Sequence, residues 1–309
     1  MVDVLIIGAG IAGLTAAIYA CRAGKKVLVL EKKAYGGQII QTYHVGNWPG
    51  EEEISGSELM GKIYHHANNL GAEISYDTVL EVREKDEFFE VVGEEKTYET
   101  RTVIIATGTI EKPLGLPREE EFAGRGISYC ATCDGAFYEG KTVVVVGGGN
   151  SALYNALYLA DVCRKVYVVH RRAEFRADAV LVEKVSRKGN VEFVMEAQPT
   201  EILGAEKLTG LAVTNSDGEW REIAADGIFV AVGKIPDTKA LAGFVETDEA
   251  GYVKAGEDCL TSRTGIFVAG DCRTKCVRQL ITAAADGAVA GNAAAALAGN
   301  AAMAVCVDE

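Results

Sequence analysis

The chain has 309 residues, of which 49% are hydrophobic and 24% are charged, so it is long enough for two domains with separate cores. Its formal net charge of −13 argues against nucleic acid or an anionic membrane surface as a partner. The eight cysteines are irregularly spaced, no signal-like segment begins the chain, and Asp286, Gly287 and Gly291 interrupt the Ala-rich C-terminal stretch. We therefore expect a cytoplasmic protein that does not span a membrane.

The chain opens with a nucleotide-binding pattern. The apolar run 4–7 predicts a strand buried on both faces, and Gly8, Gly10 and Gly13 follow it before a helical stretch. Glycines at this spacing let the backbone approach a pyrophosphate at the helix N-terminus. Glu31 ends the next apolar strand, where its carboxylate can accept hydrogen bonds from ribose hydroxyls and would repel a 2′-phosphate. The pattern predicts FAD or NAD(H).

The same pattern recurs 139 residues later, at Gly147 and Gly149. A strand precedes these glycines and a helical stretch begins at Ser151. In place of an acid, the second copy has His170, which is followed by Arg171, Arg172 and Arg176. Guanidinium groups at this position are the charge reversal that a 2′-phosphate needs, which favours NADPH. A solvated basic edge is the alternative.

Each copy is followed by a segment of alternating residues and polar turns, at 73–102 and 191–225, which predicts an antiparallel meander. Each segment returns through an apolar strand, and a third such strand, at 265–270, completes the first domain. The expected fold class is α/β. It has two Rossmann-like three-layer domains that bind FAD and NAD(P), each with an antiparallel meander insert, the second inserted in the first.

The domain boundaries are predicted at two proline-containing stretches, near Pro113–Pro117 and near Pro236. Residues 1–112 and 239–309 would form the FAD-binding domain, and residues 113–238 the NADPH-binding domain. In the first domain, Asp271 follows the third returning strand, where it is placed to bind a sugar-like hydroxyl. A simple turn at Gly270-Asp271 is the alternative.

Cys130 and Cys133 lie between the two nucleotide-binding patterns. Two thiols at this spacing can close a small disulfide and exchange it with the disulfide of another protein. Zinc sites use the same spacing, and Cys272 and Cys276 could supply two further thiolates. The placement favours redox chemistry, in which reducing equivalents pass from one nucleotide to a second cofactor and then to the dithiol.

Together these residues resemble the low-molecular-weight, bacterial-type thioredoxin reductases over essentially the whole chain. The resemblance rests on both glycine-rich turns and on segments 36–38, 106–108, 130–134, 170–176 and 270–279. It implies FAD in the first domain, NADPH in the inserted domain, a homodimer, and thioredoxin as the protein partner. NADPH would reduce the flavin, the flavin would reduce the disulfide, and the dithiol would reduce thioredoxin.

The resemblance also implies residue roles. It makes Cys133 the thiol that faces the flavin, Cys130 the thiol that attacks thioredoxin, and Asp134 the proton donor and acceptor. Beyond the glycines of the first turn, the residues that it assigns to the flavin are Glu31, Gly37, Gln38, Asn47, Asp271, Arg278 and Gln279. The residues expected to bind NADPH are Gly147, Gly149, Asn150, Ser151, His170, Arg171, Arg172 and Arg176.

Other functions stay open on the sequence alone. A flavoprotein of the same family could serve a different thiol carrier, such as a glutaredoxin-like or peroxidase-coupled protein. A ferredoxin-fed enzyme should have lost the arginines for a 2′-phosphate, which are present here. A non-catalytic flavin-binding module or a zinc-structural module is the alternative from another class, and a colourless, zinc-containing preparation would favour it.

Overall fold

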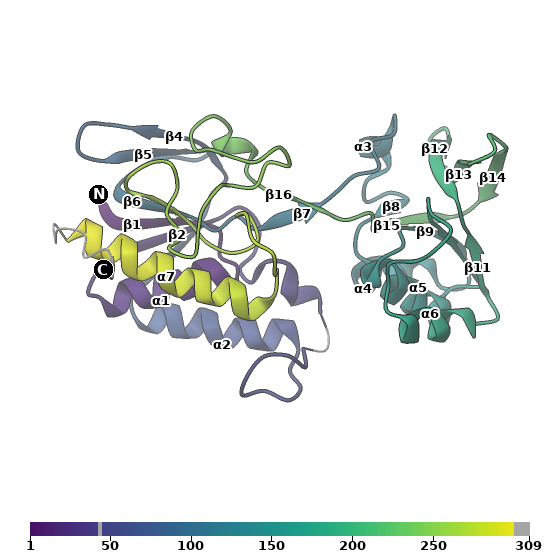
Figure 1. Ribbon diagram of the computed structural model, residues 1–309, viewed down its shortest axis with the longest axis horizontal. Coiled ribbons are helices and arrows are strands. Elements are labelled where there is room, and N and C mark those ends of the chain that lie inside the picture. The colour runs from purple at the N-terminus through teal and green to yellow at the C-terminus, as the bar shows by residue number, and fades with distance from the viewer. Residues whose placement is uncertain (43–44, 300–309) are drawn as a thin grey trace. The chain divides into compact units, whose positions relative to one another are not determined.

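The computed structural model describes residues 1–42 and 45–299, which divide into two compact units. Unit 1 contains residues 1–110 and the described residues from 235 onward, and unit 2 contains residues 111–234. The chain passes from one unit to the other through β7 (Thr109–Glu111) and returns through β16 (Lys234–Pro236). These two strands pair with each other, so the two connections run as one two-stranded ribbon (Figure 1).

Unit 1 is built on a seven-stranded sheet in the order β3-β2-β1-β6-β5-β4, with β17 also paired to β6. Its strands are β1 (Val2–Ile7), β2 (Val27–Glu31), β3 (Glu73–Tyr76), β4 (Val79–Glu84), β5 (Phe89–Gly93), β6 (Thr97–Ile105) and β17 (Ile266–Val268). Helices α1 (Ile11–Arg22), α2 (Gly56–Asn69) and α7 (Leu280–Ala298) lie on one side of this sheet (Figure 1). The short helices η1 (Gly37–Gln41) and η3 (Lys239–Leu241) belong to the loops.

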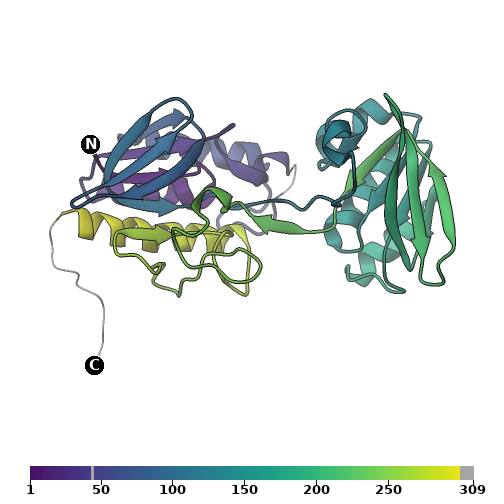
Figure 2. The ribbon, with the colours of Figure 1, turned by 90° about the horizontal axis from the view of Figure 1, so that it is seen from above.

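Unit 2 is built on a five-stranded parallel sheet in the order β11-β10-β9-β15-β8, and a separate antiparallel sheet, β12-β13-β14, accompanies it (Figure 2). The strands are β8 (Ile127–Ser128), β9 (Thr142–Val146), β10 (Lys165–Val169), β11 (Val191–Val194), β12 (Ala197–Gly204), β13 (Leu208–Asn215), β14 (Trp220–Ala224) and β15 (Gly227–Val230). The helices are α3 (Glu119–Phe122), α4 (Ala131–Asp134), η2 (Gly135–Tyr138), α5 (Asn150–Val162) and α6 (Ala179–Ser186).

The two units repeat one strand order, which confirms the predicted pair of Rossmann-like units. Reading outward from the edge strand, β3-β2-β1-β6-β17 corresponds to β11-β10-β9-β15-β8. The apolar runs of β1 and β9 are buried because both faces of a parallel sheet are covered. Strand β8 therefore takes, in unit 2, the place that β17 takes in unit 1.

The predicted meanders begin too early in the sequence. Residues 73–76 and 191–194 form β3 and β11, which pair in parallel at the edges of the main sheets, and only the strands after them are antiparallel. In a strand of only four residues, the alternation of side chains is the same whether the strand pairs in parallel or antiparallel with its neighbour. The helix before it, α2 or α6, provides the crossover that makes the pairing parallel.

Helix α7 is long and apolar enough to cross a membrane by length and composition, contrary to the expectation that its polar residues and glycines exclude this. In the fold, however, 44% of the apolar stretch of α7 is buried, and the helix packs along α1 in unit 1. Gly287 and Gly291 allow the close approach, because added Cβ atoms would lie 2.2 and 2.5 Å from the carbonyl oxygens of Ala12 and Ala16. The helix thus forms part of the core of unit 1.

We expect Gly291→Ala to lower the melting temperature, because the new methyl group would push α7 away from the backbone of α1. The cost should be about 1–3 kcal/mol, as for overpacked cores. Gly61→Ala is the matched control, since Gly61 lies in α2 with no atom within 4 Å of an added Cβ. That change should stabilise by about 0.5–1 kcal/mol. Thermal unfolding by circular dichroism measures both, and equal shifts in the same direction would contradict the close α1–α7 packing.

Candidate functional site

The first glycine-rich turn of unit 1 joins β1 to α1. Gly8 has a φ of +107°, and a Cβ there would lie 2.4 Å from the carbonyl oxygen of Ala106. A Cβ on Gly13 would lie 1.9 Å from the carbonyl oxygen of Gly8, so these two glycines allow the turn to close. Gly10 has no atom within 4 Å of an added Cβ. The backbone at Gly10 is therefore left open at the N-terminus of α1, as a pyrophosphate requires.

Glu31 is held beside this turn at the end of β2. Its two carboxylate oxygens accept hydrogen bonds from the backbone N–H groups of Ala9 (2.8 Å) and Lys33 (3.0 Å). These contacts orient the carboxylate next to the glycine-rich backbone. The acid predicted to bind ribose hydroxyls therefore lies where the Rossmann arrangement needs it.

The other predicted flavin residues come from distant parts of the chain. A Cβ on Gly37 would be 3.3 Å from the Cα of Gly10, which places the start of η1 against the turn. Gln38 donates to the backbone carbonyl and the hydroxyl of Thr109. Asn47 donates to Oε1 of Gln279 at 3.2 Å, although they are 232 residues apart. Neither residue of this last pair could be placed beside the other from sequence spacing.

Asp271 and Arg278 follow β17 in one loop, and Asp286, which sequence reasoning missed, organises that loop from α7. The buried Asp286 carboxylate accepts hydrogen bonds from the Gly270 N–H (2.9 Å), from the Arg273 guanidinium (2.8 and 2.9 Å) and from Lys275 (2.8 Å). Burial alone would raise the pKa of Asp286, but the hydrogen bonds from the two cations outweigh it and lower that pKa. An Asp in an otherwise Ala-rich helix is the signal that could have identified it.

In unit 2, the second glycine-rich turn borders a cavity of about 390 Å³. Gly147 closes the turn, since a Cβ there would lie 2.2 Å from the carbonyl oxygen of Ala231, and Gly149 is open like Gly10. The cavity lining includes these predicted residues: Gly147, Gly149, Asn150, Ser151, His170, Arg171 and Arg176. Arg172 is exposed and does not line the cavity. The lining also includes residues 111–114 of the connecting segment, which sequence reasoning did not assign to the site.

His170 differs from the other predicted cofactor residues because its ring is buried beneath the turn. A Cβ on Gly148 would lie 2.2 Å from Nδ1 of the His170 ring, and the ring stacks on Phe175 with centroids 5.4 Å apart. Its Nε2 lies 3.1 Å from the carbonyl oxygen of Glu174. Burial lowers the pKa of His170; the hydrogen bond to the Glu174 carbonyl opposes this shift, and the nearby arginines add to it. The neutral ring thus packs against both the glycine-rich turn and residues 171–176, which carry the three arginines.

Asn150 forms two hydrogen bonds with Asp178, which follows the arginine-containing residues 171–176 in the sequence. Nδ2 of Asn150 donates to the Asp178 carboxylate at 3.0 Å, and Oδ1 of Asn150 accepts from the Asp178 N–H at 2.8 Å. This reciprocal pair joins the start of α5 to the start of α6. Asp178 is a second residue that sequence reasoning missed.

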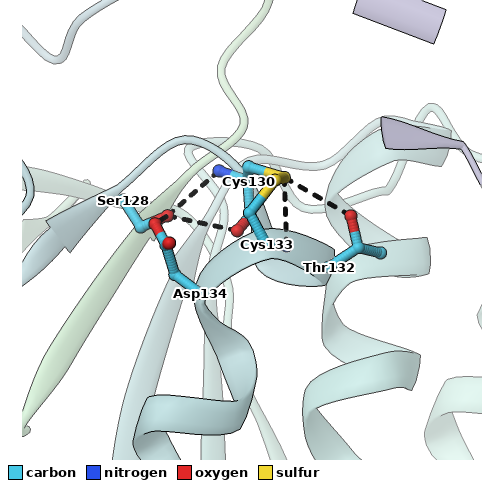
Figure 3. Close-up of a disulfide and its surroundings, with 5 residues drawn as sticks. All are labelled: Ser128, Cys130, Thr132, Cys133 and Asp134. Carbon is cyan, nitrogen blue, oxygen red and sulfur yellow. Dashed lines mark hydrogen bonds between the residues drawn. A yellow bond between two sulfur atoms is a disulfide. The ribbon is translucent and has the colours of Figure 1, made fainter. Parts of the chain in front are cut away.

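Cys130 and Cys133 form a disulfide at the start of α4, with their Cα atoms 5.3 Å apart (Figure 3). The Sγ atom of Cys130 accepts a hydrogen bond from the Cys133 N–H at 3.2 Å and lies 3.4 Å from the hydroxyl oxygen of Thr132. Cys130 is half-buried and Cys133 is exposed. The disulfide follows β8, so it lies at the carboxyl edge of the same parallel sheet that carries the second glycine-rich turn after β9.

Asp134 is paired with Ser128, a residue that sequence reasoning did not single out. The Ser128 hydroxyl lies 2.6 Å from Oδ2 of Asp134 as a donor, and its oxygen accepts the Cys130 N–H at 3.0 Å (Figure 3). One serine therefore joins the carboxylate and the backbone of the first cysteine. A hydroxyl residue two positions before Cys130 is the only sequence signal for it.

The remaining described cysteines do not complete a metal site with the redox pair. Within residues 1–42 and 45–299, no group of three or more His, Cys, Asp or Glu side chains is arranged to hold a metal ion. Cys272 is fully buried and donates to the carbonyl oxygen of Ala269 at 3.4 Å, whereas Cys276 is exposed. The two cysteines proposed as additional zinc ligands are thus in different surroundings.

Burial predicts which thiols react in the oxidised protein. It raises the pKa of Cys163 to about 11 and that of Cys259 to about 12. At pH 8 roughly one Cys163 side chain in a thousand would be a thiolate. Among the cysteines that the structure describes, we expect iodoacetamide to modify Cys276 first and to reach the buried thiols only after unfolding, as measured by peptide mass spectrometry. Equal labelling of Cys163 and Cys276 in the folded protein would contradict the described burial.

The amino-acid sequence matches a known protein family over most of its length. The family model described as pyridine nucleotide-disulphide oxidoreductase matches residues 2–288. A thioredoxin reductase of Listeria monocytogenes is 43% identical over 291 residues, covering 94% of this chain and 91% of that protein. The thioredoxin reductase of Bacillus subtilis is 42% identical over 290 residues, covering 93% and 92%.

A solved structure supports the same assignment. The crystal structure of Lactococcus lactis thioredoxin reductase matches with a TM-score of 0.90 and 38% identity, covering 96% of this chain and 99% of that one. The match extends over both units, and the predicted α/β fold class is confirmed. The chain belongs to the pyridine nucleotide-disulphide oxidoreductase family and, within it, to the thioredoxin reductases.

Proposed function

We propose that this protein is an NADPH-dependent, FAD-containing reductase of thioredoxin disulfides, acting as a homodimer in the cytoplasm. The observation that carries the proposal is the Cys130–Cys133 disulfide at the carboxyl edge of the sheet that also forms the nucleotide cavity. One unit thus combines a dinucleotide site with an exchangeable disulfide. The names of the relatives support thioredoxin as the protein substrate.

The residues of unit 1 fit an adenine dinucleotide. The open backbone at Gly10 suits a pyrophosphate, and the Glu31 carboxylate beside it suits ribose hydroxyls. We infer that the residues holding the flavin are those predicted from the sequence: Gly8, Gly10, Gly13, Glu31, Gly37, Gln38, Asn47, Asp271, Arg278 and Gln279. When bound, FAD would supply two-electron transfer between NADPH and the disulfide.

The cavity of unit 2 fits a nucleotide with a 2′-phosphate. Arg171 and Arg176 line it, and the guanidinium-bearing side chains of both are exposed. Two such groups can bind a phosphate through charge-assisted hydrogen bonds. We assign the buried His170 to support of this segment, and the exposed Arg172, which does not line the cavity, to no direct contact with the nucleotide.

The chain's own thiol chemistry is an exchange of disulfides. In the dithiol form, the thiolate of Cys130 attacks one sulfur of the oxidised partner, and the partner's second sulfur leaves as a thiolate. Cys133 then attacks Sγ of Cys130, which re-forms the internal disulfide and releases the reduced partner. The N–H of Cys133 and the hydroxyl of Thr132 beside Sγ of Cys130 favour a thiolate at Cys130. Asp134, oriented by Ser128, is placed to hold or supply a proton.

The test is an anaerobic titration of the purified holoenzyme. NADPH should bleach the flavin absorbance, and oxidised thioredoxin should restore it, with FAD rather than FMN released on heating. A panel containing an oxidised glutaredoxin tests the alternative thiol carrier. If no thioredoxin restores the absorbance and another carrier does, the proposed substrate is wrong. Light scattering of the holoenzyme tests the homodimer.

A further inference from the structure

A buried carboxylate in unit 2 plays no part in the chemistry described so far. Glu119, the first residue of α3, is only 4% exposed. Its carboxylate oxygens accept hydrogen bonds from three successive backbone N–H groups, those of Leu114 (2.8 Å), Gly115 (2.7 Å) and Leu116 (3.4 Å). This single side chain therefore fixes the backbone of the segment that enters unit 2.

The same carboxylate has a fourth donor, the hydroxyl of Tyr129, at 2.7 Å. Tyr129 directly precedes Cys130, so its ring and its hydrogen bond determine where the backbone enters the redox turn. Burial, and next the bond to Glu119, raise the pKa of Tyr129 well above its usual range. The hydroxyl therefore stays protonated and continues to donate across the physiological pH range.

The segment held by Glu119 also borders the nucleotide cavity. Leu114 lines that cavity together with the second glycine-rich turn and Arg171. Leu114, Leu116 and Tyr129 all pack against one hydrophobic cluster, which includes Val146 at the end of β9. The cavity wall and the redox turn thus share both a buried carboxylate and a common core.

We propose that Glu119 and Tyr129 are positioning residues that hold the Cys130–Cys133 turn in its disulfide geometry and join it to the wall of the nucleotide cavity. The inference rests on the proposed function and deepens it, because it names the residues that keep the redox turn and the nucleotide site in one arrangement. Neither side chain touches a reacting atom. Their effect passes through the backbone at Cys130 and at Leu114.

Tyr129→Phe is the most direct variant, since it removes one hydroxyl and leaves the ring and the three N–H contacts of Glu119. The positioning role requires this hydrogen bond to be stronger in the disulfide form than in the dithiol form, so its loss should shift the equilibrium of the pair with glutathione toward the dithiol by roughly three- to tenfold. Thiol trapping and mass spectrometry of the holoenzyme measure this equilibrium. The kcat/KM for thioredoxin should fall, while the binding of adenosine 2′,5′-bisphosphate should stay the same.

Unit 1 provides a matched control. The hydroxyl of the buried Tyr98 donates to the buried Asp77 carboxylate at 2.9 Å, and that carboxylate also accepts a backbone N–H, that of Glu95. Tyr98→Phe therefore deletes the same kind of bond far from the redox turn in the sequence. It should lower thermal stability much as Tyr129→Phe does, and leave the glutathione equilibrium unchanged.

Glu119→Gln tests the connection to the cavity, because an amide cannot accept from every N–H group that the carboxylate now satisfies. Calorimetry should show binding of adenosine 2′,5′-bisphosphate weakened by roughly two- to tenfold. Unchanged binding in a folded Glu119→Gln protein would overturn the connection. If this variant does not fold, Tyr129→Phe still decides the role at the disulfide.

A glutathione equilibrium for Tyr129→Phe that matches wild type and Tyr98→Phe would overturn the positioning role. This measurement requires neither NADPH nor thioredoxin, so it is independent of the proposed function. If wild type fails to reduce thioredoxin, the proposed function is wrong while the equilibrium still tests the pair. If wild type reduces thioredoxin and Tyr129→Phe behaves identically in every measurement, only the positioning inference is wrong.

Discussion

Replacing Cys130 with serine should abolish the reduction of thioredoxin and leave the reduction of the flavin by NADPH intact. The variant cannot form the internal disulfide, and it lacks the sulfur that we propose attacks the partner, so the remaining Cys133 thiol cannot complete the exchange. Hydride transfer from the nicotinamide to the flavin involves no sulfur. Stopped-flow absorbance measures flavin reduction, and insulin turbidity in the presence of thioredoxin measures the complete reaction.

The matched control is Cys276→Ser, which removes an exposed thiol outside the redox turn. It should change neither measurement. Loss of flavin reduction in Cys130→Ser would refute the proposed order of electron flow. Retained thioredoxin reduction in that variant would show that the Cys130–Cys133 pair is not the working disulfide.

The double change Arg171→Ala and Arg176→Ala should reduce the preference for NADPH over NADH by a hundredfold or more. Both arginines line the cavity that we propose binds NADPH, and each charge-assisted contact to a 2′-phosphate should contribute about 1.5–3 kcal/mol. NADH has no 2′-phosphate, so its kcat/KM should change little. The ratio of the two kcat/KM values for flavin reduction is the measurement.

Arg187→Ala is the control for this pair, because Arg187 is an exposed arginine of the same unit that forms an ion pair with Glu183 of α6. It should leave the ratio unchanged. An unchanged ratio in the Arg171/Arg176 variant would contradict the assignment of the cavity to NADPH. A large fall in NADH use as well would indicate damage to the turn rather than loss of phosphate recognition.

Local sequence patterns determined most of the architecture of this protein. The apolar runs before Gly8 and Gly147 predicted buried parallel strands, and in the structure both strands pair in parallel with their two neighbours. The 139-residue offset predicted two similar units, and the strand orders agree. Such inferences succeed because a turn of closely packed glycines and a strand buried on both faces impose their requirements on consecutive residues. The disulfide between Cys130 and Cys133 is local in the same sense.

Only the tertiary structure decided the contacts between distant segments. The direction of β3 and β11 depended on which strand each one joined, and a four-residue pattern does not encode that choice. Likewise, His170 stands in the sequence where the first nucleotide-binding pattern has the acid Glu31. In the folded protein, packing buries the His170 ring beneath Gly148. Asn47 meets Gln279, and Tyr129 meets Glu119, through folding alone. A hydrogen bond between separate loops leaves no periodic signal, because its geometry arises only once the cores that carry the two loops have packed.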